Sequence, residues 1–272
     1  MQNKIQIALE YWRDRLSKEY GKEHILNIAL YGSQNYNLDT PKSDIDVKAI
    51  YIPSLTEAIL NKKRLSKELH NEKGEHCELK DIREMCDMYK KQNINFLETL
   101  FTEYRWDNPK YNTINSMLKS KAEDIARYNP YYGIKSICGQ ILNTIKQFKK
   151  DTHNYNLKKV SKAIFLYLYL YKYITNKRYK DCLRVDIVND KFLDYPFAYA
   201  LIMKLKTKTL YDFNDNELLI LKNSIDFLEK YLIELMTNIK QDDYYINDTV
   251  EQFLNIICFK AILKLQDLKK VV

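Results

Sequence analysis

Two aspartates separated by one residue, Asp44 and Asp46, are the residues whose type and spacing most directly indicate chemistry in this chain. They alternate with Ile45 and Val47, so a β-strand here would direct both carboxylates to one face and both apolar side chains to the core. Two carboxylates this close repel each other unless a divalent cation lies between them, and hard oxygen ligands suit Mg²⁺ or Mn²⁺. The pair therefore predicts a cation site.

A Gly-Ser pair, Gly32 and Ser33, follows the apolar segment 25–31, and ten residues separate Ser33 from Asp44. Glycine lets the backbone approach a phosphate, and the amides after Gly32 can donate hydrogen bonds to a triphosphate together with the Ser33 hydroxyl. If both segments are strands of one sheet, the phosphate donors and the metal ligands share one edge. The alternative is a turn that lies beside an unrelated acidic strand.

This pattern resembles the DNA polymerase β superfamily of nucleotidyltransferases, in which a strand ends in Gly-Ser, an acidic-x-acidic strand follows, and a later strand carries a third carboxylate. The chain is most similar to the bacterial and phage group of predicted nucleotidyltransferases, through Tyr31-Gly32-Ser33, Thr40-Pro41 and Ser43-Asp44-Ile45-Asp46. Asn37 stands where those proteins usually have Gly, and Asn is the commonest other residue at positive φ, so we expect the turn to survive. The resemblance is specific over residues 25–105 and loose beyond them.

The third carboxylate implied by the resemblance must be Glu75, Glu78 or Asp81. We expect Glu78, because it lies between Cys77 and Leu79 in a predicted strand that would direct it to the face of the aspartates. Asp81 has the spacing of a capping residue at the start of the next helix. The alternative for Glu78 is an exposed charge on an edge strand.

The resemblance implies a two-metal reaction. Asp44, Asp46 and Glu78 would be the catalytic residues and metal ligands: one cation activates the acceptor hydroxyl, and a second, held by the aspartates and the phosphates, neutralises the leaving pyrophosphate. Ser43 is expected to hold the loop at the nucleotide rather than to attack, since no histidine lies near it in sequence. The expected nucleotide-binding residues are Gly32, Ser33, Ser43, Lys158, Lys159 and Lys162, the three lysines matching basic residues that often face the nucleotide in the resembling group.

Other polar residues are expected to have no part in the chemistry. The four histidines, His24, His70, His76 and His153, form no metal-binding spacing, and we expect them on the surface or in packing. Glu98 is expected to be structural, with Asn95 capping the helix near it. Lys204, Lys206 and Lys208 are expected on an exposed face.

The elements that must position these residues change in character near residue 110. Before it, the sequence predicts a helix over 4–20, strands over 25–31 and 45–52, a short helix over 55–60, and a hairpin of 64–70 and 75–80. After it, apolar residues three and four apart predict helices over 112–127, 131–150, 156–175, 190–205, 214–238 and 247–267. We therefore expect an α+β fold: a nucleotidyltransferase domain, residues 1–110, with a mixed sheet and flanking helices, then an all-helical domain, residues 111–272, with the triphosphate between them.

Composition limits the surroundings and partners. The chain has 272 residues, 46% of them hydrophobic, and its five cysteines include no Cys-x-x-Cys pair, which predicts a globular protein of the reducing cytoplasm without disulfides or structural zinc. The charged N-terminal segment predicts neither a signal peptide nor a membrane span, and the apolar run 163–171 predicts a buried helix. A net charge of +8 suits a nucleic-acid partner, although solvated helix faces explain dispersed lysines better.

The sequence thus predicts transfer of a nucleoside monophosphate from a triphosphate, with Mg²⁺ or Mn²⁺, to a hydroxyl of RNA (especially a tRNA end), a protein side chain or a small molecule, in that order. Two alternatives stay open: a non-catalytic or antitoxin-like interaction module of the same fold, and a sensor that binds nucleotide without turnover. No membrane partner is expected, and the oligomeric state is left open.

Overall fold

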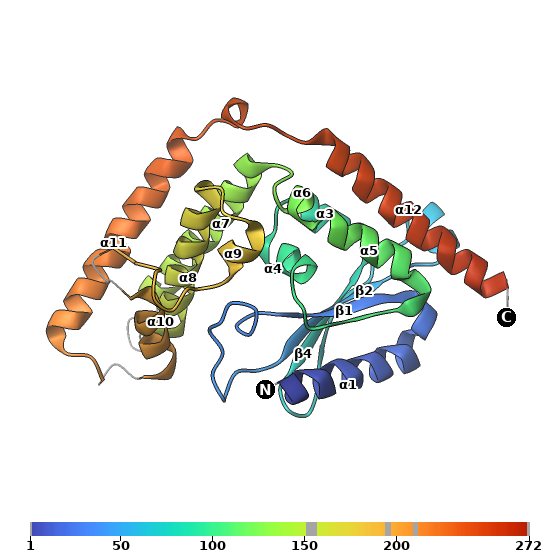
Figure 1. Ribbon diagram of the computed structural model, residues 1–272, viewed down its shortest axis with the longest axis horizontal. Coiled ribbons are helices and arrows are strands. Elements are labelled where there is room, and N and C mark those ends of the chain that lie inside the picture. Colours follow the sequence, from blue (N-terminus) through green and yellow to red (C-terminus); the bar gives the residue numbers. More distant parts are fainter. Residues whose placement is uncertain (1, 151–156, 194–196, 209–211, 271–272) are drawn as a thin grey trace. The chain divides into compact units, whose positions relative to one another are not determined.

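The protein is α+β and contains a five-stranded mixed sheet with the strand order β3-β4-β2-β1-β5 (Figure 1). The computed structural model describes residues 2–150, 157–193, 197–208 and 212–270. The strands are β1 (Ile25–Tyr31), β2 (Asp46–Tyr51), β3 (Ser66–His70), β4 (His76–Asp81) and β5 (Arg105–Asp107). β1 is antiparallel to both β2 and β5, β2 is parallel to β4, and β3 is antiparallel to β4.

The two faces of the sheet differ because the strands alternate apolar and polar residues. On one face, Val47 and Ala49 of β2 and Cys77 and Leu79 of β4 pack against α1 (Gln2–Tyr20), whose residue Trp12 is fully buried there. The opposite face therefore carries the intervening side chains of β2 and β4. These include Asp46 and Glu78, the acids expected in the site from these two strands. The helix α3 (Ile82–Lys90) contacts β2 and β4 (Figure 1).

Short capped helices connect the strands. α2 (Leu55–Ile59) begins with a capping box formed by Ser54 and Glu57, and α3 begins at Asp81, whose side chain accepts a hydrogen bond from the amide of Arg83. Asn93, not the expected Asn95, caps α4 (Ile94–Leu97), because the Asn95 amide donates to the Asn93 side chain at 3.0 Å. The remaining short elements here are 3₁₀ turns at Lys22–His24, Glu98–Leu100 and Pro109–Tyr111, followed by α5 (Asn112–Ser120) and α6 (Ala122–Ala126).

The C-terminal helix, α12 (Asp248–Lys270), packs with the sheet-containing part of the chain. It contacts α2, α3 and α5, and Figure 1 shows it running beside α5. The first compact unit therefore consists of residues 1–35, 39–129 and 246–272, and the second of residues 36–38 and 130–245. This division differs from the expected boundary near residue 110, because α5, α6 and α12 bury their apolar faces in the first unit.

The second unit is helical. It contains α7 (Pro130–Lys150), α8 (Leu157–Ile174), α9 (Tyr179–Leu183), α10 (Ala198–Thr207) and α11 (Asp215–Asn238), with a 3₁₀ turn at Gln241–Asp243. Most of α8 is buried, which confirms the buried helix predicted for residues 163–171. α10 starts later than the helix predicted from residue 190, and residues 194–196 of that prediction lie outside the described residues.

The short segment 36–38 is held inside the second unit, although it interrupts the first in sequence. Tyr36 stacks on Phe165 with ring centroids 4.2 Å apart, and its carbonyl accepts from the Val185 amide at 3.0 Å. Lys206 donates to the carbonyl of Leu38. Lys204, also on α10, forms an ion pair with Glu217. These two lysines therefore make contacts within the protein, whereas the sequence predicted an exposed face for them.

All five cysteines are free thiols, and burial raises the pKa of Cys138 to about 12, which keeps it protonated. None of the helices in the described ranges combines the length and the apolar character needed to cross a bilayer.

Candidate active site

The turn after β1 lies next to the start of β2. Tyr31, the last residue of β1, pairs with Asp46, the first residue of β2, so Gly32 and Ser33 begin beside that aspartate. Gly32 has a φ of 97°, a conformation that other residues rarely adopt, and a side chain built there would meet no atom within 4 Å. The space in front of the turn is open.

A buried carboxylate anchors this turn. Glu98, which is fully buried, accepts a hydrogen bond from the Gly32 amide at 3.1 Å and another from the Asn35 side chain at 3.3 Å. Asn35 also donates to the Leu30 carbonyl and accepts from Thr102 at 2.8 Å. The Gly32 amide is already hydrogen-bonded to Glu98. The donors that remain for a phosphate are the Ser33 amide and hydroxyl, which hydrogen-bond to nothing in the described part of the chain.

The loop from this turn to β2 is closed by Ser43. Its hydroxyl accepts from the Thr40 amide at 2.8 Å, and its own amide donates to the Thr40 carbonyl at 2.9 Å. Gln34 reaches across the loop and donates to the carbonyl of Asp44 at 2.7 Å. Ser43 therefore holds the loop, as expected, and leaves the Asp44 side chain exposed just before β2.

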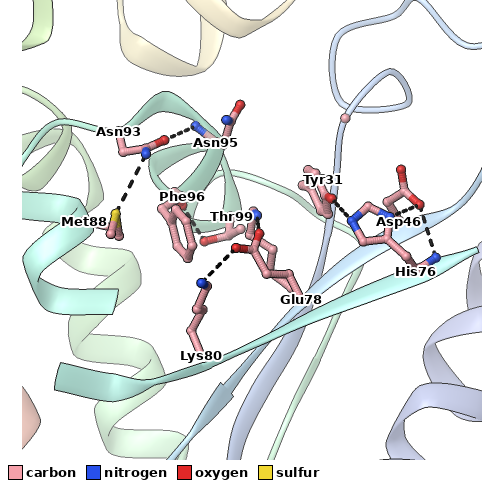
Figure 2. A network of polar contacts seen from close by, with 12 residues as sticks. Tyr31, Asp46, His76, Glu78, Lys80, Met88, Asn93, Asn95, Phe96 and Thr99 are labelled. Atoms are coloured by element: carbon pink, nitrogen blue, oxygen red, sulfur yellow. Dashed lines mark hydrogen bonds and ion pairs between the residues drawn. The ribbon is translucent and has the colours of Figure 1, made fainter. Parts of the chain in front are cut away.

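Asp46 is held by a histidine. The His76 ring nitrogen Nδ1 lies 2.7 Å from Asp46 Oδ1, and the His76 amide donates to the same oxygen at 3.3 Å. On the other side of the ring, Nε2 hydrogen-bonds to the hydroxyl of Tyr31 (Figure 2). Burial, followed by the charges of Asp46 and Glu78, raises the pKa of Tyr31, so its hydroxyl keeps its proton. His76 was expected to be an ordinary surface or packing residue.

Glu78 faces two lysines. Its carboxylate forms an ion pair with Lys48, which is 5% exposed, and a second one with Lys80 at 3.3 Å. The Lys48 ammonium lies 4.1 Å from the ring centroid of Tyr31 and 4.4 Å from that of Phe96. Burial alone would raise the pKa of Glu78, but the hydrogen bonds and charges of the two lysines outweigh burial and lower it.

The register of β2 and β4 explains these partners. Val47 pairs with Cys77 and Lys48 with Glu78, so Asp46 has His76, not Glu78, as its nearest neighbour on β4. The expected acids Asp46 and Glu78 share a face of the sheet, but Glu78 lies opposite Lys48, two residues further along β2 than Asp46. The other candidates for the third acid are also engaged: Asp81 is buried against Arg83, and Glu75 accepts from the side chain of Asn71.

The carboxylates that remain open are those of Asp44 and Asp46. Asp46 Oδ2 accepts no hydrogen bond from the described residues, and the Asp44 carboxylate likewise has no partner among them. No group of three or more His, Cys, Asp or Glu side chains in the described ranges is arranged to hold one metal ion. Asp44 and Asp46 are thus the two expected ligands with carboxylate oxygens free of protein partners in the described ranges, and Glu78 as placed does not complete a set of three.

No protein-family model matches this chain, and no curated protein matches it significantly. What the site does must therefore be inferred from its residues.

The expected lysines lie on the other compact unit. Lys158 and Lys162 are exposed and Lys159 is half-buried on the first turns of α8, whereas Ser33, Asp44 and Asp46 belong to the unit that contains the sheet.

Sequence reasoning missed three contributors to the site: Lys48, His76 and the anchoring role of Glu98. For two of them a signal was present. Lys48 continues the alternation of Asp44 and Asp46, and His76 stands two residues before Glu78 on the same strand face. Whether His76 or Glu78 of β4 lies opposite Asp46 depends on the register, and alternation alone leaves the register open.

Proposed function

We propose that this protein is a metal-dependent nucleotidyltransferase, which transfers a nucleoside monophosphate from a nucleoside triphosphate to an acceptor hydroxyl. The observation that carries the proposal is the pairing of Tyr31 with Asp46, which puts a glycine turn with free donors beside an open carboxylate. Phosphate donors and oxygen ligands for a divalent cation at one sheet edge are what binding of a triphosphate with its cation requires.

Each residue has a defined part in this reaction. The Ser33 amide and hydroxyl bind the phosphates, while Gly32 and the Glu98 anchor set the shape of the turn. Asp44 and Asp46 would hold Mg²⁺ or Mn²⁺, which supplies charge neutralisation for the phosphates and polarises the phosphoryl group. The acceptor oxygen bonds to the α-phosphorus as the bond to pyrophosphate breaks, and the proton of the acceptor hydroxyl passes to solvent.

Glu78 has two possible roles within this proposal. Its two lysine partners support a structural role, the neutralisation of the buried Lys48. A role as third metal ligand requires the carboxylate to leave Lys48 when nucleotide and cation bind. A second candidate function is a sensor that binds nucleotide and cation without turnover. A Glu78 that stays paired with Lys48 favours the sensor.

The acceptor is proposed on charge. A net charge of +8 supports RNA, and a tRNA end in particular, ahead of a protein side chain or a small hydroxylated molecule. An interaction module without catalysis, of the antitoxin kind, would have no use for the open aspartates beside the Ser33 donors.

The test is incubation of the protein with each α-³²P-labelled nucleoside triphosphate, Mg²⁺ or Mn²⁺, and total RNA or a protein extract. We expect label to pass to one acceptor class with the wild type and not with Asp44→Asn. Nucleotide binding that depends on Asp44, without any transfer, would establish the sensor instead. Absence of both binding and transfer would overturn the proposal.

A further inference from the structure

His76 differs from the other described histidines, because both of its ring nitrogens hydrogen-bond to side chains of the candidate site. Nδ1 is bonded to Asp46 and Nε2 to Tyr31, and the His76 backbone amide also reaches Asp46 (Figure 2). The imidazole therefore lies between the residue that ends β1 and the residue that begins β2.

The chemistry of the three groups fixes the direction of these hydrogen bonds. A carboxylate only accepts hydrogen bonds, so Nδ1 carries a proton and donates it to Asp46, and in the Nδ1–H tautomer Nε2 accepts from the Tyr31 hydroxyl. Both donors of His76, the ring and the amide, bind the same oxygen, Oδ1. Oδ2 is left without a partner in the described residues, and the β1–β2 register pairs Asp46 with Tyr31, the residue before the Gly32–Ser33 turn.

We propose that His76 is a positioning residue for Asp46: it fixes one carboxylate oxygen so that the other is presented to the divalent cation that accompanies the nucleoside triphosphate. The inference rests on the proposed function. A ligand held by an outer hydrogen bond keeps one orientation and loses less freedom when the cation binds, and removal of such a bond typically weakens metal affinity by about 10- to 100-fold.

A purely structural role for His76 predicts a different pattern. The imidazole side chain is 26% exposed and stacks on His70 with ring centroids 5.8 Å apart, so it fills no part of the apolar core. A surface-packing residue needs the shape of the ring and not its two nitrogens. Substitutions that keep one nitrogen position and lose the other therefore separate the two roles.

Asparagine and glutamine make this separation. In His76→Asn the amide nitrogen can take the place of Nδ1 and still donate to Asp46, whereas the longer side chain of His76→Gln reaches toward the place of Nε2 and Tyr31. Tyr31→Phe removes only the hydroxyl that fixes the tautomer. His70→Gln changes the stacked neighbour, which has no bond to Asp46, and is the matched control.

Electron paramagnetic resonance measures the Kd of Mn²⁺ in the presence of an α,β-methylene nucleotide. Thermal unfolding of each variant is measured as a control for stability. We expect His76→Gln to raise the Kd by about tenfold or more and His76→Asn by about threefold or less, with Tyr31→Phe between them. His70→Gln should equal the wild type, and the four variants should unfold at similar temperatures.

Asp46→Asn distinguishes failure of this inference from failure of the proposed function. If Asp46→Asn weakens Mn²⁺ binding and His76→Gln does not, His76 is not a positioning residue. An equal loss in His76→Asn and His76→Gln would also overturn the inference, because it would show no dependence on Nδ1. If Asp46→Asn binds Mn²⁺ like the wild type, the cation site itself is absent and the proposed function fails.

Discussion

At the scale of single residues, the Lys48–Glu78 ion pair predicts how the protein responds when one charge is removed. Side chains that are 6% and 17% exposed exclude most solvent, so Glu78→Gln leaves a buried ammonium without its carboxylate. We expect the free energy of unfolding to fall by about 2–3 kcal/mol. This is less than most broken buried ion pairs cost, because the Tyr31 and Phe96 rings still attract the Lys48 ammonium. Urea unfolding measures it.

Two controls accompany this prediction. Glu75→Gln removes a charge from the turn before β4 and should change stability by about 0.5 kcal/mol or less. The double variant Lys48→Met with Glu78→Leu removes both charges and should recover most of the loss. If Glu78→Gln is as stable as the wild type but binds Mn²⁺ poorly, Glu78 is the third metal ligand that the sequence predicted.

The same pair predicts a dependence on pH. The pKa of Glu78 is lower in the folded protein than the usual value near 4.5, because Lys48 and Lys80 outweigh burial. A lowered folded pKa means that the pair stabilises the protein fully above the unfolded pKa and that this contribution disappears as the pH falls through the folded pKa. The stability difference between wild type and Glu78→Gln should therefore be constant at neutral pH and shrink in acid. A difference that grows in acid would contradict the assignment.

Ser33 and Ser43 lie in one loop and should respond differently to alanine. Ser33 contributes no hydrogen bond to the described structure, so Ser33→Ala should leave unfolding unchanged and weaken triphosphate binding by about 1–2 kcal/mol, the value of one hydrogen bond to a charged phosphate. Ser43→Ala removes the acceptor of the Thr40 amide and should instead destabilise the loop. Titration calorimetry with a non-hydrolysable triphosphate, beside thermal unfolding, separates the two; unchanged affinity in Ser33→Ala would remove Ser33 from the site.

At the scale of elements, the loop between β1 and β2 depends on a left-handed residue. Asn37 has a φ of 63°, the positive φ that the sequence analysis expected at this turn. Asn37→Ala should cost about 1 kcal/mol because a Cβ disfavours this conformation, whereas Asn37→Gly should cost less, although both lose the weak bond to the Val185 carbonyl. Urea unfolding of both variants is the measurement, and equal costs would show that the side-chain bond, not φ, holds the turn.

The strands show what a sequence can and cannot predict. β1 was predicted with its observed bounds, because a run of apolar residues ends at a glycine, and β4 and the Asp81 cap followed from alternation and capping spacing. The three residues of β5 were missed, since Arg105, Trp106 and Asp107 show no alternation. The partners of Asp46 and Glu78 were missed for another reason: they depend on how far β4 is shifted along β2, which tertiary packing decides.

At the scale of the whole molecule, the sequence predicted α12 as a helix but not the unit in which it packs. Leu254 is fully buried and its carbonyl accepts from the thiol of Cys86 on α3, so this helix completes the first unit. Periodicity identifies an apolar face without saying what covers it, and for that reason α12 was expected in the helical domain.

Leu254→Ala tests this assignment. Loss of a fully buried leucine should cost about 2–5 kcal/mol and raise hydrogen exchange in α3 and α5 before α7 and α8. Ile256→Ala, on a residue that is 48% exposed in the same helix, should cost about 0.5 kcal/mol or less. Increased exchange confined to α7 and α8 would show that α12 supports the second unit.

The chain crosses between the two units at residues 35–36, 38–39, 129–130 and 245–246, and this path has a consequence for a nicked protein. A protease that cuts once between residues 129 and 130 yields two pieces, each of which supplies a part of the other's unit. The N-terminal piece carries residues 36–38, which stack and hydrogen-bond within the second unit, and the C-terminal piece carries α12 of the first. The cut chain would therefore remain one particle, interlocked by exchanged segments in the manner of a domain-swapped pair.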